Sequence, residues 1–175
     1  MRARNGLRIA AACLAAGALP LAGQGASIGP QISNSRDTDI GVGLRAVLDL
    51  GPLDFGLRVI GSFDLFFPDD YELEGGDGGV AGDVDYWEAN LNLAYDVGLP
   101  LIPISPYIGG GLNIAHIELR DTPNDEALAL DQTDTGVNVL AGVEVDAGPI
   151  APFVEFRYEI LGGEQWVLTG GILFG

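Results

Sequence analysis

The chain has 175 residues, a length that suggests a single domain, and it is both apolar and glycine-rich, with 47% hydrophobic residues and 27 glycines. Its formal net charge of −17 at pH 7 disfavours binding to nucleic acid or to anionic surfaces, so we expect no nucleic-acid role. Beyond the N-terminal region, no apolar run reaches the roughly 20 residues that a membrane-spanning helix needs.

The first element is an N-terminal stretch with the plan of a secretory signal peptide, predicted to cover residues 1–25. A basic head formed by Arg2, Arg4 and Arg8 precedes an apolar stretch, and small residues follow it. A structural N-terminal helix is the alternative, and a glycine and a proline inside the apolar stretch disfavour it. The leader contains the single cysteine, Cys13, so the mature chain of residues 26–175 is expected to hold neither a disulfide nor a thiol nucleophile.

Eight segments beyond the leader alternate apolar and polar residues, as β-strands do when successive side chains point to opposite faces. In chain order they are residues 26–34, 39–50, 53–66, 86–97, 107–119, 135–146, 152–161 and 165–175. The seventh, "PFVEFRYEIL", shows the pattern most clearly, because Val154, Phe156 and Tyr158 share one face while Glu155 and Arg157 share the other. In the fifth segment, the alternation of apolar and polar residues is lost near the only histidine. Most segments have roughly 9 to 12 residues, which suits tilted strands that cross a hydrocarbon layer.

The connections between these segments alternate between two kinds. Three of them, at residues 49–52, 96–100 and 146–149, begin Asp-x-Gly and soon reach a proline, which predicts tight turns at one end of a meander. At the other end, residues 68–85 and 120–134 are long, acidic connections. Compact turns at one rim and long polar loops at the other are typical of outer-membrane barrels.

Two barrels are compatible with the alternation: a soluble barrel with its apolar face inside, and a membrane barrel with its apolar face toward lipid. The membrane barrel is favoured by the leader and by aromatic residues near the strand ends, which resemble an interfacial girdle. These aromatic residues are Trp87, Tyr95, Tyr158, Trp166 and Phe174. We therefore predict an all-β fold, an eight-stranded antiparallel up-and-down transmembrane β-barrel preceded by a signal peptide. A soluble secreted barrel that binds an apolar ligand remains the alternative.

The polar face of the predicted strands carries ionisable residues of both signs. They are Arg45, Asp49, Asp54, Arg58, Asp64, Glu88, Glu144, Glu155, Arg157 and Glu159. Opposite charges lie two or four positions apart on one strand, so we expect them to pair across a narrow lumen. The chain has no lysine, and arginine is the better partner for enclosed carboxylates. An eight-stranded barrel is just wide enough for its own side chains, so a structural plug is favoured over a narrow porin-like pore.

These features together resemble the small eight-stranded outer-membrane barrels, the OmpX-like and OmpA-like β-barrel domains. The last strand, "WVLTGGILF", ends in an aromatic residue and is similar to the C-terminal signal that the barrel-assembly machinery reads. The resemblance implies a place in the bacterial cell envelope, in the outer membrane. Its partners there would be outer-membrane lipid, lipopolysaccharide and, during insertion, the assembly machinery. It implies a structural or surface-interaction role without a cofactor, and the extracellular partner stays open. Because the sequence ends at Gly175, we expect no peptidoglycan-binding domain.

Two further groups of residues each allow a functional and a plainer interpretation. Some barrels of this architecture are lipid A deacylases with a His-x-Ser pair, but here His116 is followed by Ile117 and Glu118, so we predict a rim histidine and no enzyme. One long connection offers hard oxygen donors for a weak calcium or magnesium site, although their spacing matches no EF-hand. These donors are Asp69, Asp70, Glu72, Glu74 and Asp77. The plainer interpretation is a solvated acidic loop, and we predict no metal.

Overall fold

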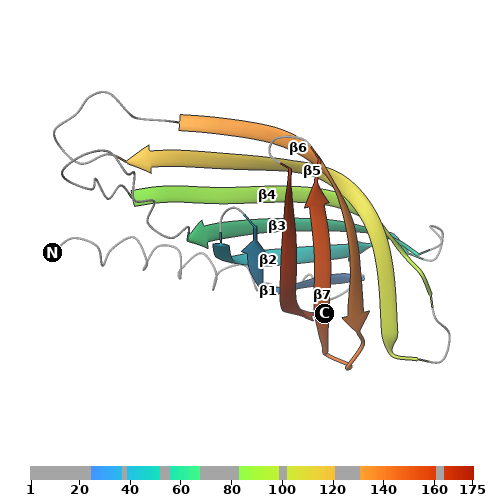
Figure 1. Ribbon diagram of the computed structural model, residues 1–175. Helices are drawn as coiled ribbons and strands as arrows, with labels where there is room; N and C mark the ends of the chain where they lie inside the picture. Colours follow the sequence, from blue (N-terminus) through green and yellow to red (C-terminus); the bar gives the residue numbers. More distant parts are fainter. Residues whose placement is uncertain are drawn as a thin grey trace, which may run out of the picture.

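The computed structural model describes residues 25–36, 39–51, 56–67, 83–98, 102–120, 131–160 and 164–175. Nearly all of the predicted leader therefore lies outside the described residues. Figure 1 shows eight strands: β1 (Ala26–Ser35), β2 (Asp39–Asp49), β3 (Leu57–Phe67), β4 (Asp83–Asp96), β5 (Ile104–Arg120), β6 (Asp131–Val145), β7 (Ile150–Glu159) and β8 (Gln165–Phe174). Within these ranges, no helix is long and apolar enough to cross a membrane.

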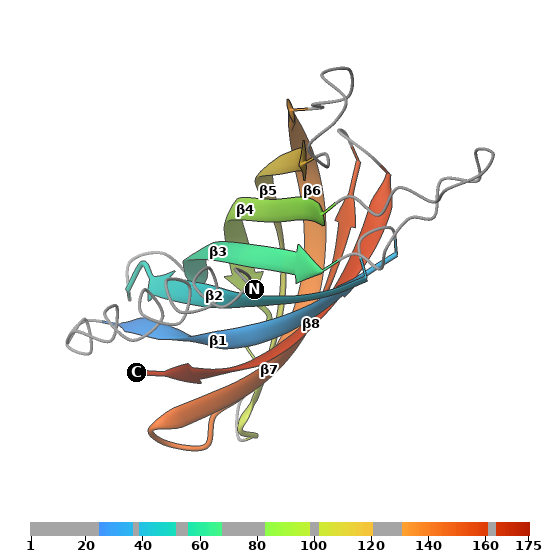
Figure 2. The ribbon, with the colours of Figure 1, turned by 90° about the vertical axis from the view of Figure 1, so that its left-hand side faces the viewer.

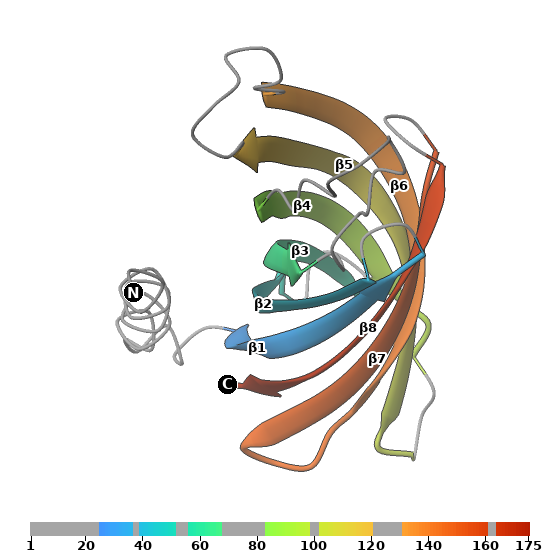
Figure 3. The same ribbon diagram turned by 60° about the vertical axis from the view of Figure 1, so that its left-hand side comes forward.

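The strands close into one barrel. Each strand pairs antiparallel with the next one along the chain, and β8 pairs antiparallel with β1, for example through Ile28 and Phe174. The curved sheet that results is seen from two further directions in Figures 2 and 3. Closure gives the backbone amides of the first and last strands a partner, which hydrocarbon does not supply. The predicted eight-stranded up-and-down barrel is confirmed.

Tight turns close one end of the barrel. The Leu50 amide donates to the Leu57 carbonyl after β2, and the Ala147 amide donates to the Ile150 carbonyl after β6. In the latter turn, the Gly148 amide donates to the Asp146 carboxylate at 3.0 Å, and Gly148 has a φ of 85°. The aspartate of the Asp-x-Gly sequence thus accepts a hydrogen bond from the turn, and the glycine supplies the left-handed conformation.

Three neighbouring strands, β4, β5 and β6, are longer than the sequence predicts, with 14, 17 and 15 residues. Their ends rise beyond the rest of the barrel as a projecting wall of residues 83–85, 116–120 and 131–136 (Figure 1). The expected loss of phase near His116 does not interrupt β5, whose pairing with β4 is continuous to Arg120. Instead the polarity changes: Ile117 packs inward against Phe66, Tyr86 and Val167.

Side-chain exposure shows which face of the sheet is inside. The apolar face points outward, and Leu91 on β4 and Leu112 on β5 are each 60% exposed. The charged face points inward, where Arg157 is 1% and Glu88 0% exposed. Apolar residues that were not predicted for the lumen share this interior. They form one cluster of Val47, Ile60, Ala94, Tyr107, Leu140, Phe153 and Leu173 and another of Phe66, Tyr86 and Val167.

Candidate functional site

The candidate site is the lumen, and its most buried ion pairs surround Arg157 on β7. The Arg157 Nη2 lies 2.8 Å from Glu88 Oε1, which β4 supplies from a non-neighbouring part of the barrel wall. The Arg157 Nε lies 3.2 Å from Glu159 Oε1 on the same strand. All three side chains are at most 2% exposed. We call these three residues the Arg157 centre.

Neutral polar side chains surround the Arg157 centre with further hydrogen bonds. The side-chain amide of Asn90 donates to Glu88 at 2.8 Å, and the side-chain amide of Gln165 donates to Glu159 at 2.7 Å. The Ser35 hydroxyl in turn donates to the side-chain amide oxygen of Gln165, Oε1, at 2.5 Å. Gln165 and Ser35 were not predicted as lumen residues, although the alternation of their strands places both on the inward face.

Asp64 on β3 is completely buried, and in the described part of the chain it is held by neutral donors instead of an arginine. The Gln31 amide reaches both carboxylate oxygens at 2.8 and 2.9 Å, and the Ser33 hydroxyl lies 3.0 Å from one of them. On the neighbouring strand β2, Gly43 lies directly opposite Asp64, and an added Cβ there would lie 2.4 Å from the Asp64 Oδ1. A glycine is therefore required at this position to make room for the carboxylate.

A second buried pair joins β2 to β7. The Arg45 Nη2 donates to Glu155 Oε2 at 2.7 Å, and the Tyr107 hydroxyl lies 3.0 Å from both groups. The Arg45 guanidinium also lies 4.3 Å from the centre of the Phe153 ring. Asp49 lies four positions after Arg45 on the same strand, but the partner of Arg45 in the structure is Glu155, because the stagger of the barrel brings β7 to it.

The third arginine, Arg58, lies near the end of the barrel that carries the tight turns. Its guanidinium is 2.6 Å from Asp96, 2.7 Å from Glu144 and 3.8 Å from Asp49. These three carboxylates are 23%, 20% and 56% exposed, so water reaches them. We call these four residues the Arg58 centre. Asp96 was not predicted as a member, although the alternation of β4 places it on the inward face, and the predicted member Asp54 lies outside the described residues.

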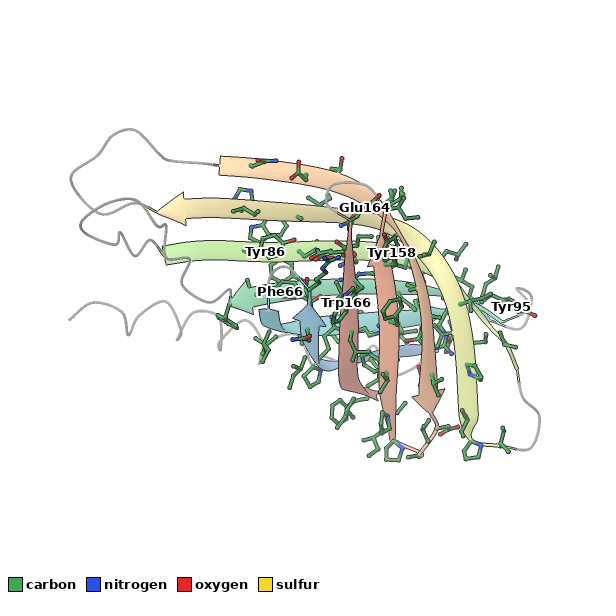
Figure 4. All side chains as sticks on the ribbon, in the orientation of Figure 1. Phe66, Tyr86, Tyr95, Tyr158, Glu164 and Trp166 are labelled. Carbon is green, nitrogen blue, oxygen red and sulfur yellow. The ribbon has the colours of Figure 1, made fainter. Side chains whose placement is uncertain are left out.

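The aromatic residues of the predicted girdle all belong to the outward face. Tyr95, Tyr158, Trp166 and Phe174 are exposed, and Trp87 is half-buried. Figure 4 labels Tyr95 beside the tight-turn end and Tyr158 and Trp166 nearer the opposite end. Trp87 stacks on Phe63 with ring centres 5.7 Å apart. This distribution is the one expected of side chains at two membrane interfaces.

His116 lies on the outward face at the base of the projecting wall. Its ring stacks on Trp87 with centres 5.2 Å apart, and its Nδ1 lies 2.9 Å from the Thr133 hydroxyl. The side chain of Glu118 lies outside the described part of the structure. The five acidic residues of the weak metal candidate, Asp69, Asp70, Glu72, Glu74 and Asp77, lie outside the described residues.

The structure is similar to known outer-membrane barrels. The N-terminal β-barrel domain of OprF from Pseudomonas aeruginosa matches with a TM-score of 0.59 and 18% identity, covering 86% of this chain and 97% of that domain. Ail, the attachment invasion locus protein of Yersinia pestis, matches with a TM-score of 0.53 and 16% identity over 85% of this chain and 95% of Ail, and has also been solved with the heparin analogue sucrose octasulfate. A major outer membrane protein of Thermus thermophilus matches with a TM-score of 0.52 and 14% identity, covering 85% of this chain and 98% of that protein.

The chain has the fold of the eight-stranded outer-membrane β-barrels. No known protein family matches its sequence, and no curated protein is significantly similar to it. The similarity to these proteins is therefore one of fold.

Proposed function

We propose that the chain is an outer-membrane β-barrel protein whose lumen is closed by its own ion pairs, and that it has a structural or surface-interaction role. The observation that carries this proposal is the reversed polarity of the barrel. Leucines such as Leu91 point outward and are 60% exposed, whereas Arg157 and Glu88 are enclosed. Burying apolar surface in lipid is favourable by roughly 25 cal/mol per Å², so this exterior is stable in a bilayer and unfavourable in water.

Three properties of the lumen support a plug in preference to a pore. Arginines at successive heights, Arg58, Arg45 and Arg157, reach across the interior to carboxylates on other strands. Apolar clusters fill the space beside them, with Tyr107 and Phe153 packed close to the Arg45 guanidinium. An eight-stranded barrel has no width to spare once such side chains occupy it. A narrow porin-like pore requires these side chains to move apart.

Planar-bilayer recording tests the plug. We expect the refolded wild-type protein to give no stable unitary conductance. The variant Arg157→Ala removes the cross-lumen contact to Glu88, and an increased conductance in this variant supports the ion pair as part of the barrier. Steady conductance by the wild-type protein would overturn the plug. Outer-membrane fractionation of the expressed protein separately tests its membrane location.

The partners proposed for this barrel follow from its exterior. The outward apolar residues contact outer-membrane lipid, including the acyl chains of lipopolysaccharide. The last strand, β8, supports recognition by the barrel-assembly machinery during insertion, because it ends with the outward-facing Phe174. Ail has been solved with a heparin analogue, but sulfated ligands do not suit the present chain, whose net charge is −17. We therefore do not transfer that ligand.

An enzymatic role is the second candidate, and the surroundings of His116 favour a non-catalytic residue. The hydroxyl group that is hydrogen-bonded to the His116 Nδ1 is that of Thr133, which lies on the exposed outer face of its strand. Its ring is stacked on Trp87, as expected of an interfacial aromatic pair. Mass analysis of lipid A from cells with the wild-type protein or with His116→Ala tests this alternative, and a deacylated product that depends on His116 would establish an enzyme.

A further inference from the structure

Four asparagines lie together on the inward face of three neighbouring strands. Asn90 is directly opposite Asn113 in the pairing of β4 with β5, and Asn92 is directly opposite Gly111. On the other side of β5, Asn138 is also directly opposite Gly111. Residues that face each other in this way are about 5 Å apart. We call the four asparagines the asparagine array, and each of them is at most 5% exposed.

Two hydrogen bonds fix how the amide groups of the array are turned. The side-chain amide of Asn90 donates to Glu88 Oε1 at 2.8 Å, since an ionised carboxylate can only accept. The Asn90 Oδ1 in turn accepts from the side-chain amide of Asn138 at 3.1 Å, across the strand that separates them. The Asn138 Oδ1 is therefore left as an acceptor outside this relay.

The array leaves several buried oxygen atoms without a hydrogen-bond partner among the described residues. They are the Oδ1 atoms of Asn92, Asn113 and Asn138, together with Glu88 Oε2. The Asn92 Oδ1 lies over Gly111, where an added Cβ would be 2.5 Å from it. All four atoms are acceptors, and a buried acceptor without a partner is unfavourable. A ligand that satisfies them must bring positive charge or hydrogen-bond donors.

The surrounding charge favours a cation over neutral donors. Glu88 and Glu159 share Arg157, and Asp64 is directly opposite Glu88 on β3. Three enclosed carboxylates thus face one guanidinium, which leaves an excess of negative charge when all are ionised. Water would donate hydrogen bonds but leave this excess, and buried charges need to be paired. A proton would satisfy only one of the four unpartnered oxygens.

The donor set indicates the kind of cation. Amide and carboxylate oxygens are hard ligands, which suit hard cations better than soft transition metals. Both oxygens of Asp64 and of Glu159 already accept hydrogen bonds, so Glu88 supplies the one free carboxylate oxygen. Calcium sites usually draw on several carboxylates, and the described residues contain no group of three or more acidic, histidine or cysteine side chains that could hold a metal ion. One free carboxylate oxygen matches a singly charged cation.

We propose that the lumen binds one monovalent inorganic cation, sodium or potassium, through three amide oxygens of the asparagine array and the free carboxylate oxygen of Glu88. The cation joins β4, β5 and β6 and offsets part of the excess negative charge beside Arg157. The inference rests on the closed lumen proposed above. Planar-bilayer recording detects a failure of the plug, whereas cation-dependent unfolding detects a failure of this site, so the two are distinguishable.

The test is urea unfolding of the refolded wild-type barrel in vesicles of zwitterionic lipid. Sodium or potassium chloride is replaced stepwise by N-methylglucamine chloride at constant ionic strength. A cation that binds only the folded state raises the folding equilibrium constant in proportion to its concentration above the Kd. We therefore expect about a tenfold rise for a tenfold increase in sodium or potassium. The same folding equilibrium constant in all three salts would overturn the proposal.

A pair of variants locates the effect. Asn92→Ala removes one ligand, and we expect it to weaken cation binding about tenfold. The matched control is Thr169→Val, an equally buried substitution that removes a hydrogen bond to Ser33 at the seam of β1 and β8. It should keep the cation affinity within about twofold of wild type, because distant sites act independently. An equal loss of affinity in both variants would overturn the assignment of the site to the array.

A second measurement depends on no variant. Thallous ion, a potassium analogue with strong anomalous X-ray scattering, is soaked into crystals of the wild-type barrel. We expect an anomalous peak within bonding distance of the array oxygens and Glu88. A peak elsewhere in the lumen, or no peak, would overturn the site. Loss of the peak when an equal concentration of calcium is added would overturn the choice of a monovalent cation.

Discussion

The Arg157 centre and the Arg58 centre contain the same types of group but differ in their access to water. In the Arg157 centre, Glu88 and Glu159 are at most 2% exposed. In the Arg58 centre, the carboxylates are 20–56% exposed, with Asp49 the most accessible. The desolvation cost of an ion pair is large when both charges are enclosed and small when water still solvates one of them. We therefore expect ion pairs of the same residue types to contribute differently to stability, according to their position along the barrel axis.

The largest effect is expected for Arg157→Leu. The substitution leaves Glu88 and Glu159 enclosed without a cation, and breaking a buried pair in this way costs about 3–5 kcal/mol. Denaturant unfolding of the barrel in lipid vesicles measures the change in the free energy of unfolding. The heat resistance of the folded band on a gel should fall in parallel.

A control for this substitution is Val154→Leu, at an outward and exposed position of the same strand. Its effect should stay within about 0.5 kcal/mol, because surface substitutions away from buried networks are usually small. An Arg157→Leu barrel as heat-resistant as wild type would show that water enters the Arg157 centre, and the contrast between the two centres would then be lost.

Most of the fold was predictable because polar and apolar residues alternate along every strand of a membrane barrel that crosses lipid. In β7, Val154 and Phe156 alternate with Glu155 and Arg157, and this period of two identifies the strand and its faces. The full lengths of β5 and β6 were not predictable in the same way. Outside the bilayer both faces of a sheet contact water, so β6 begins with residues such as Gln132 and Asp134 whose polarity carries no period.

The lumen was predictable as a set of inward residues but not as a set of pairs. Arg157 and Glu159 are two positions apart on one strand, and they do meet. Arg45 pairs with Glu155, which lies far along the sequence, because the stagger between strands fixes which levels face each other across the barrel. That stagger is a property of the closed structure and is not encoded in the period of any single strand.

An intermediate effect is expected for Tyr107→Phe, at a height between the two centres. The substitution removes a hydroxyl that contacts both Arg45 and Glu155 at 3.0 Å but leaves their own ion pair in place. The free energy of unfolding should fall by about 1.5 kcal/mol, as for a buried hydrogen bond to a charged group. The control Tyr158→Phe removes an outward hydroxyl, and an equal loss in that variant would contradict a specific role for the buried one.

A smaller effect is expected for Arg58→Leu, although this arginine contacts more carboxylates than Arg157 does. Asp96 and Glu144 are partly solvated, so water replaces much of what the guanidinium supplied, and the cost should be about 1 kcal/mol. Raising the salt concentration should shrink this cost, because accessible charges are screened. The cost of Arg157→Leu should change little with salt, and a similar salt dependence for both variants would contradict the assigned difference in access.

The smallest effect is expected for Asp49→Asn, where the arginine–carboxylate distance of 3.8 Å is the longest in the Arg58 centre and the aspartate is 56% exposed. Such a pair should contribute less than about 0.5 kcal/mol. A double-mutant cycle with Arg58→Leu isolates the coupling between the two side chains, since each single variant removes the same interaction. The corresponding cycle for Arg157 and Glu88 should give a coupling several times larger. If the two couplings were equal, enclosure would not be what separates the centres, and the residues around each arginine would have to be compared instead.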